Sequence, residues 1–205
     1  MSTTSSSPRQ LRLPKAERRA QLLEAAHAVF SERGYHGTAM DAIAEAAQVS
    51  KPVLYQHFPG KRELYLALLD SELSALEGRL VTAVSKTEDN RERVNATVRV
   101  FFEYVAQDSG SHRLIFASDL GNDSDVSARL KTFEEAVGRA IGTIIEAQAG
   151  LPAPAAELLG HALAGAAQTG AMRWAAAPEV PLDTAVELVA RLAWRGIGQF
   201  PKDIA

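Results

Sequence analysis

Apolar residues recur along this chain three and four positions apart, which is the spacing of helices that bury one face. A first helix is expected from Lys15 to Arg33, because Pro14 stands where a helix can begin and Gly34 where a helix can end. No segment shows the sustained alternation of apolar and polar residues that is typical of a strand. The pattern therefore predicts an all-α protein. The apolar positions of this first helix are Leu22, Ala25, Ala26, Val29 and Phe30.

Turn-forming stretches divide the rest of the chain into further helices, about nine in all. Thr38 and Asp41 read as a capping box that starts a short second helix, and Ser50 precedes a third that ends near His57. The later helices are expected over residues 61–84, 91–108, a short piece around 112–120, a long helix ending at Gly150, 155–177 and 184–200.

The third helix has two chemically different faces. Leu54 and Phe58 lie four residues apart and form an apolar anchor, while Lys51 with Tyr55 and Pro52 with Gln56 lie on the opposite side. The hydroxyl of Ser50 is expected to accept a hydrogen bond from the Val53 N–H, since Pro52 has none. A capped helix, a three-residue turn and a short cationic helix together indicate a helix-turn-helix.

Charge separates the two parts of the chain. Residues 1–62 carry nine Lys and Arg against five Asp and Glu, or +4, and the remainder carries 13 against 20, or −7. A basic end on an acidic body suggests that the N-terminal part meets a polyanion. The domains expected are a disordered arm over 1–13, a DNA-binding domain over 14–60 and a helical domain over 61–205, joined by the helix 61–84. Arg9 and Arg12 in the arm are expected to be solvated, with contact to the minor groove as the alternative.

The chain resembles the TetR-type transcriptional regulators over "RAQLLEAAHAVFSERGYHGT" and "TAMDAIAEAAQVSKPVLYQHFPGKRELYLALL", the second of which runs from Thr38 to Leu69. The resemblance implies a homodimer that places two recognition helices in successive major grooves of an operator, and a C-terminal domain for ligand binding and dimerisation. The chain departs from the family pattern at Gln48 and Pro52, where Gly is frequent. Together with "FFEYVAQDSGSHRLIFASDL", the same stretch also resembles an actinobacterial branch that controls fatty-acid synthesis and senses long-chain acyl-CoA.

Carried over by position, the resemblance implies two sets of DNA contacts. The residues expected at the DNA backbone are Thr38, Ser50, Tyr55, His57 and Lys61. Lys can donate to guanine, Gln can pair with adenine, and an apolar side chain can touch a thymine methyl. The residues expected at base edges are Lys51, Pro52, Val53 and Gln56.

The last two helices are rich in small residues, among them Gly160, Ala164, Gly165, Ala167, Ala171, Val186, Val189, Ala193 and Gly196. Such faces let helices approach closely, so we expect a homodimer through these helices, with packing inside one chain as the alternative. A hydrophobic effector, such as a long-chain acyl-CoA, is expected between the middle helices. The pocket candidates are Phe101, Tyr104, Val105, Leu114, Phe116, Phe133, Val137, Ile141 and Arg173, with Arg113, Arg129 and Lys131 as further cations for its phosphates.

Other classes of protein fit the sequence less well. No Gly-x-Ser-x-Gly elbow, Gly-rich phosphate loop or His-Glu-x-x-His pair is present, so we do not expect an enzyme. With no cysteine and scattered histidines, neither a metal site nor another cofactor is expected, and a reducing cytoplasm suits the chain. The weakly polar run 158–177 contains His161, Gln168 and Arg173, so a membrane span is not expected. We expect a ligand-responsive repressor that controls lipid metabolism. The alternatives are a regulator of multidrug efflux and a helical carrier that does not bind DNA.

Overall fold

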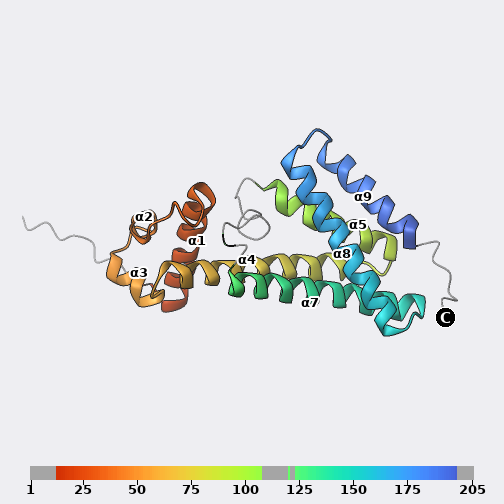
Figure 1. Cartoon of the computed structure of the whole chain (residues 1–205), viewed down its shortest axis with the longest axis horizontal. Helices are drawn as coiled ribbons and strands as arrows, with labels where there is room; N and C mark the ends of the chain where they lie inside the picture. The colour runs from red at the N-terminus through yellow and green to blue at the C-terminus, as the bar shows by residue number, and fades with distance from the viewer. Residues whose placement is uncertain (1–12, 108–119, 121–122, 198–205) are drawn as a thin grey trace, which may run out of the picture.

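The computed structural model describes residues 13–107, 120 and 123–197, which form eight α-helices and no strand (Figure 1). The prediction of an all-α protein is confirmed. The short helix expected around 112–120 lies outside the described residues apart from Leu120, and the arm over 1–13 lies outside them apart from Leu13. The helices are α1 (Lys15–Arg33), α2 (Met40–Ala46), α3 (Lys51–His57), α4 (Lys61–Val84), α5 (Asn90–Ala106), α7 (Ser124–Ala149), α8 (Ala153–Ala176) and α9 (Leu182–Ile197).

Local caps explain where several helices begin and end. The carboxylate of Asp89 accepts hydrogen bonds from the N–H groups of Arg91 and Glu92, and Asp123 does the same for the first turn of α7. Gly150 ends α7 in the left-handed conformation, with φ of 65° and ψ of 23°. These groups satisfy backbone donors and acceptors that a helix end leaves without intrahelical partners.

The first three helices gather around the first turns of α4 at one end of the molecule (Figure 1). Their shared core contains Leu22, Phe30, Ile43, Leu54 and Phe58, all buried. The ring of Tyr65 in α4 packs edge-on against Phe30 and Tyr35, with centroids 5.2 Å apart in both pairs. The start of α4 is therefore packed into the same core as α1, which fixes the orientation of the three helices relative to the rest of the chain.

Beyond this end, α7 runs beside α4, and α8 crosses α7 at very short range (Figure 1). A methyl group added at Gly160 would lie 2.1 Å from the carbonyl oxygen of Gly138, so the two backbones meet where glycine is required. Gly160, Ala164, Ala167 and Ala171 are all buried within the single chain. The small residues on this face of α8 serve packing inside the chain, which corrects the expectation that they form the dimer interface.

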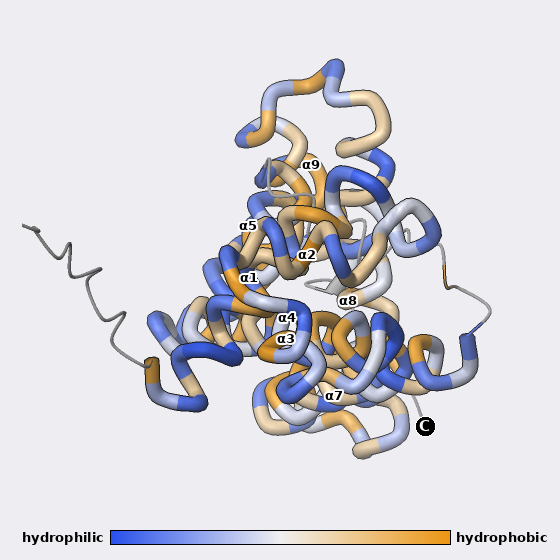
Figure 2. The backbone as a smooth tube through the Cα atoms, turned by 90° about the vertical axis from the view of Figure 1, so that its left-hand side faces the viewer, coloured by the Kyte–Doolittle hydropathy of each residue, from blue (hydrophilic) through white to orange (hydrophobic). Residues whose placement is uncertain are grey.

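Figure 2 views the molecule from the end that carries α1 to α3. Hydrophobic and hydrophilic stretches alternate along the helices, as expected where each helix turns one face to the core. Within the described part of the chain, no helix combines the length and the apolar character that crossing a bilayer requires.

Candidate nucleic-acid interface and ligand cavity

The turn between α2 and α3 has a tight, unusual backbone. Gln48 adopts φ of 54°, in the left-handed region, and the N–H of Val49 donates to the carbonyl of Ala44 over 3.0 Å. The turn thus has a left-handed residue, the conformation that favours glycine, although this chain has a side chain there. It reverses the chain within a few residues and brings α3 against α2.

The two faces of α3 are arranged as predicted. Leu54 and Phe58 are buried, whereas Lys51, Pro52 and Gln56 are exposed and Tyr55 is 46% exposed. Val53 and His57 are half-buried at the borders between the faces. A short helix therefore presents a polar, cationic surface to solvent while two apolar side chains hold it from behind.

Ser50 occupies the N-cap position of α3, but its side chain makes no capping hydrogen bond. The N–H of Val53 donates instead to the backbone carbonyl of Ser50, over 3.0 Å. The expected bond from Val53 to the Ser50 hydroxyl is therefore wrong, because the backbone oxygen already satisfies that donor. Pro52 lies in the first turn, where its missing N–H costs little.

Thr38 does not start α2, and its side chain does not face solvent. The helix begins at Met40 after Ala39, with no side-chain cap. Thr38 is only 3% exposed, and its hydroxyl donates to the carbonyl of Gly34 over 2.7 Å. The expected capping box is therefore wrong, because the Thr38 side chain holds the end of α1 instead. The contact of Thr38 with the DNA backbone stays a prediction.

Lys61 also has a partner inside the protein. Its ammonium donates to the carbonyls of Tyr35 and Thr38, each over 2.8 Å, and lies 4.4 Å from the centre of the Tyr35 ring. A cation at the start of α4 is thus explained without an external anion. These two hydrogen bonds use two of the three donors of the ammonium. The expected contact of Lys61 with the DNA backbone stays a prediction.

Two polar contacts near α3 were not predicted from the sequence. Asp41 in the first turn of α2 accepts a 2.6 Å hydrogen bond from the ammonium of Lys51, in an exposed ion pair. The guanidinium carbon of Arg19 lies 4.4 Å from the centre of the Phe58 ring and covers the outer end of the anchor. Both contacts join residues ten or more positions apart, so they depend on the tertiary fold and not on a local pattern.

Arg62 joins the end of the molecule that carries α1 to α3 to the start of α7. Its guanidinium donates to both carboxylate oxygens of Asp123, over 3.0 and 3.1 Å, and to Asp125 over 2.7 Å. Partial burial alone would raise the pKa of Asp123, but hydrogen bonds from the Val126 N–H, from Arg62 and from the Asp125 N–H together lower it. Hydrogen bonds to Asp125 and Asp123 raise the pKa of Arg62 above its ordinary value. A second pair, Arg129 with Asp70 over 2.7 Å, lies further along the same two helices.

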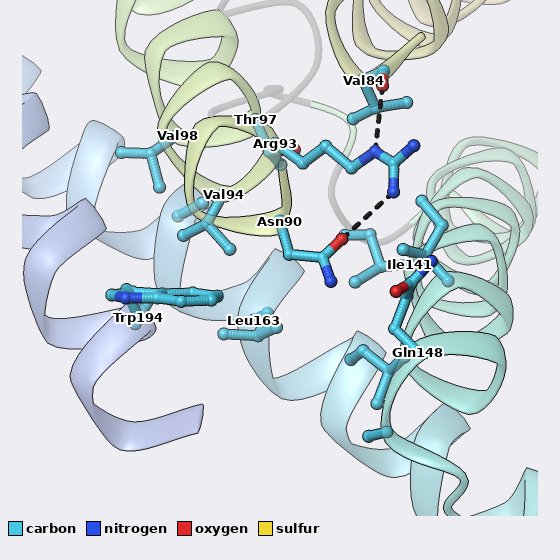
Figure 3. A pocket seen from close by; sticks show the side chains of 15 residues that line it. Val84, Asn90, Arg93, Val94, Thr97, Val98, Ile141, Gln148, Leu163 and Trp194 are labelled. Carbon is cyan, nitrogen blue, oxygen red and sulfur yellow. Dashed lines mark hydrogen bonds between the residues drawn. The ribbon is translucent and has the colours of Figure 1, made fainter. Parts of the chain in front are cut away.

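A cavity of about 190 Å³ lies in the other half of the molecule, between α4, α5, α7, α8 and α9 (Figure 3). Valine, leucine, isoleucine, alanine and tryptophan side chains make up most of its lining, and Asn90, Arg93 and Gln148 are among the polar residues there. A smaller cavity of about 60 Å³ adjoins it, because both are lined by Val84, Thr97, Ile141 and Ile144.

Of the predicted pocket residues that the structure describes, two line these cavities. Ile141 lines both, and Val137 lines the smaller one. Arg173 is exposed on α8 away from them, and Leu114 and Phe116 lie outside the described residues. The remaining four are buried in the packed core and line neither cavity: Phe101, Tyr104, Val105 and Phe133. Arg93, the cation that does line the larger cavity, was missed because helical spacing alone does not show which polar residues face inward.

Comparison with known proteins agrees with this arrangement. Residues 22–68 match the profile of the bacterial regulatory proteins of the tetR family. The chain is 41% identical over 191 residues, 93% of its length and 87% of the relative's, to the HTH-type transcriptional activator FasR of Mycolicibacterium smegmatis. A TetR-like transcriptional regulator from Rhodococcus sp. RHA1 is similar in structure, with a TM-score of 0.68 and 30% identity over 92% of this chain and 100% of that one. The transcriptional regulator FadR from Bacillus subtilis, solved in complex with stearoyl-CoA, shares the fold, with a TM-score of 0.68 at 19% identity over 85% of this chain and 96% of that one.

The helix-turn-helix with its exposed cationic face, the helical body and these similarities lead to one conclusion. The chain belongs to the TetR family and is a DNA-binding regulator of transcription.

Proposed function

We propose that this regulator binds its operator as a homodimer, with α3 in the major groove, and that a hydrophobic effector in the cavity changes its affinity for DNA. The observation that carries the DNA-binding mode is the exposure of Lys51, Tyr55 and Gln56 on the side of α3 opposite the buried Leu54 and Phe58. A two-turn helix held in this way can enter the major groove with its polar face against the bases.

The exposed residues divide into two roles in this proposal. Lys51, Pro52 and Gln56 reach base edges, and the half-buried Val53 contributes an apolar contact at the border. Ser50, whose hydroxyl makes no cap, and the donors Tyr55 and His57 contact phosphates. Thr38 and Lys61 act from inside the protein by holding the chain between α1 and α2. Lys51 leaves Asp41 when it meets a base.

The proposed homodimer uses faces of α8 and α9 that the chain itself leaves uncovered. Leu158, Leu188 and Leu192 are 70%, 59% and 73% exposed. On α8, Leu158, Ala162 and Gly165 follow one another at helical spacing on the exposed side, and a methyl group added at Gly165 would meet nothing within 4 Å. Large apolar side chains exposed on two adjacent helices support a four-helix interface between protomers.

The cavity supports an effector with an apolar chain. That FadR, with the same fold, was solved with stearoyl-CoA supports the use of such a site for an acyl chain. Three of the four cations expected to meet the CoA phosphates do not support that part: Arg129 pairs with Asp70, Lys131 with Glu135, and Arg173 lies away from the cavity. The fourth, Arg113, lies outside the described residues. A long-chain acyl-CoA as the effector and the control of lipid metabolism therefore stay predictions. The alternative, a regulator of multidrug efflux, also stays open.

The expected repressor also stays a prediction, since the relative FasR is named an activator. A reporter gene behind the selected operator gives the direction: expression falls in the presence of a repressor and rises in the presence of an activator. Binding to chromosomal DNA places the protein in the cytoplasm under this proposal.

The experiment that tests the proposal selects operators from random duplexes with the wild-type protein and measures affinity by mobility shift. We expect affinity to fall by roughly 10³–10⁵-fold between 50 and 200 mM salt if the dimer neutralises about six to ten phosphates. Lys51→Ala should weaken binding by about 1–3 kcal/mol and relax base preference at one position in each half-site. Tyr55→Phe should cost about 1 kcal/mol at all sequences.

Lys86→Ala, which changes a cation far from α3, is the matched control and should leave affinity unchanged. A helical carrier would retain no duplex even as the wild type. A flat salt titration would contradict the proposed docking of α3.

A further inference from the structure

The cavity has a polar side and an apolar side (Figure 3). Asn90 and Arg93 of α5 lie on the side toward α7, together with Gln148 of α7, while Val94 and Val98 of α5 lie toward Trp194 of α9. Gln148 and the neighbouring Ala149 are exposed, so the polar side is also the side nearest solvent. A site of this form fits a molecule with an apolar chain and one polar end.

The charge of the lining is unusual for this half of the chain. Arg93 is the one cation among the described lining residues, and no Asp or Glu is among them. Residues 63–205 carry a formal charge of −7, so a lining with a lone positive charge stands out from its surroundings. A single cation beside two amides matches a single negative charge better than the several charges of a phosphorylated ligand.

The guanidinium of Arg93 is held in place while it keeps donors for a ligand. Its Nε donates to the carbonyl of Val84 over 3.3 Å, and one terminal nitrogen donates to the side-chain oxygen of Asn90 over 3.1 Å. These bonds use two of the five N–H donors that an arginine has. The bond to the Asn90 oxygen also leaves the amide nitrogen of Asn90 as a donor on the same side.

We propose that the effector is an aliphatic chain ending in one carboxylate, which Arg93, Asn90 and Gln148 bind at the polar side of the cavity. This inference rests on the proposed effector function and names the chemical class of the ligand. The apolar chain lies toward Val94, Leu163 and Trp194.

The size of the cavity sets how the chain fits. An apolar cavity of about 150 Å³ holds one benzene-sized molecule, so the 190 Å³ present here takes a short part of an aliphatic chain.

The same arginine connects the ligand site to α4, the helix that leads to α1, α2 and α3. Val84, whose carbonyl Arg93 holds, is the last residue of α4, and α4 begins at Lys61 beside α1. A carboxylate that draws the guanidinium inward competes with this carbonyl, so the end of α4 is bound differently with and without ligand. A difference of this kind is what a ligand needs in order to shift a conformational equilibrium.

The test measures binding of decanoate, decan-1-ol and decanoyl-CoA, and of the 16-carbon member of each class, by calorimetry at pH 7. In the wild type we expect each acid to bind about 10- to 100-fold more tightly than the alcohol of the same length, because only the acid makes charge-assisted hydrogen bonds. Arg93→Met should abolish this ratio, and Arg93→Lys should keep part of it. Arg91→Met, an exposed arginine on the same helix, is the matched control and should leave the ratio unchanged. The acid should change operator affinity in the wild type and not in Arg93→Met.

Equal binding of acid and alcohol by the wild type would overturn the inference without any variant, so a folding defect in Arg93→Met does not decide the matter. Tighter binding of the CoA ester than of the acid would also overturn it, while leaving the proposed effector function intact. If no amphiphile of any class binds, the effector function itself fails and the inference fails with it. DNA binding by the unliganded protein is independent of all these outcomes.

Discussion

At the residue scale, the backbone of Gln48 has an unfavourable conformation that the rest of the fold compensates. Its φ of 54° is in the left-handed region, which costs an ordinary side chain roughly 1–2 kcal/mol. Gln48→Gly removes this cost but gives the unfolded chain more freedom, so we expect the free energy of unfolding to rise by up to about 1 kcal/mol. Urea denaturation measures this change. Ala75→Gly, at an exposed position inside α4, is the control and should lower the same free energy by about 1 kcal/mol; a loss of stability in both variants would contradict the argument.

Lys61 allows a positioning role to be separated from a phosphate contact. Since its ammonium donates to the carbonyls of Tyr35 and Thr38, Lys61→Ala should lower the free energy of unfolding by roughly 1–3 kcal/mol. The slope of log affinity against log salt should stay the same, whereas loss of a phosphate contact would reduce it by about one. Chemical denaturation and salt-dependent mobility shifts give the two quantities. A reduced slope with unchanged stability would restore the role expected from the sequence.

The sequence predicts which face of its helix a residue occupies better than it predicts which group a polar side chain will bond. The faces of α3 follow from spacing, since Leu54 and Phe58 can share a side only if Lys51 and Tyr55 take the other. Thr38 and Lys61 lie 23 residues apart, and the bond between them depends on how α4 is placed against α1. No local pattern contains that information, so both were assigned to the DNA backbone.

At the scale of the elements, the crossing of α7 and α8 depends on glycine. A Cβ at Gly160 would lie 2.1 Å from a backbone oxygen, and backbone cannot move aside as the end of a flexible side chain can. We expect Gly160→Ala to lower the free energy of unfolding by at least about 2–3 kcal/mol. Gly78→Ala in α4 is the control, because nothing lies within 4 Å of its added methyl group, and it should raise stability by about 0.5–1 kcal/mol. Thermal denaturation of both variants checks the contrast, and a stable Gly160→Ala protein would show that the helices can separate.

The ion pair between Arg62 and Asp123 makes the contact of α4 with α7 depend on pH. Hydrogen bonds lower the pKa of Asp123 in the folded protein below the ordinary value of an aspartate. The carboxylate therefore contributes stability that is fully present above the unfolded pKa and is lost as pH falls through the lower, folded value. Asp123→Asn keeps a side chain that can cap α7 but removes the charge. The difference in urea midpoint between wild type and variant should be constant from pH 7 to about pH 5 and should shrink below about pH 4.

Asp89→Asn provides the matched control for this pH dependence. Asp89 caps α5 with the same pair of backbone bonds, and no guanidinium pairs with it among the interactions that the structure describes. Its substitution should change the midpoint much less. An equal effect of the two variants would mean that capping, rather than the ion pair, stabilises the start of α7.

Helix ends were predictable where one side chain defines them and less so where tertiary packing does. Asp89, Asp123 and Gly150 act locally, so α5, α7 and their bounds follow from turn chemistry within one or two residues. The N-cap of α2 is predicted one residue early, at Thr38 and not at Ala39, because the Thr38 hydroxyl donates to the Gly34 carbonyl and does not cap the helix. The cavity could not be located from the sequence at all, since core and cavity residues share the same helical spacing.

At the scale of the whole molecule, the proposed interface between the exposed faces of α8 and α9 would set whether the α3 helices of two protomers can bind DNA together. We expect Leu192→Asp to convert the dimer into a species of 22.0 kDa, the mass of one chain, in light scattering at micromolar concentration. A charge at a side chain that is 73% exposed in the monomer costs little there but would be buried between protomers. Operator affinity should fall by roughly 10²–10⁴-fold, because the second half-site no longer binds as part of the same complex. Val81→Asp, which places the same charge on an exposed part of α4, should change neither mass nor affinity. A Leu192→Asp protein that stays dimeric would move the interface away from these two helices, and the spacing of the two recognition helices would then need another explanation.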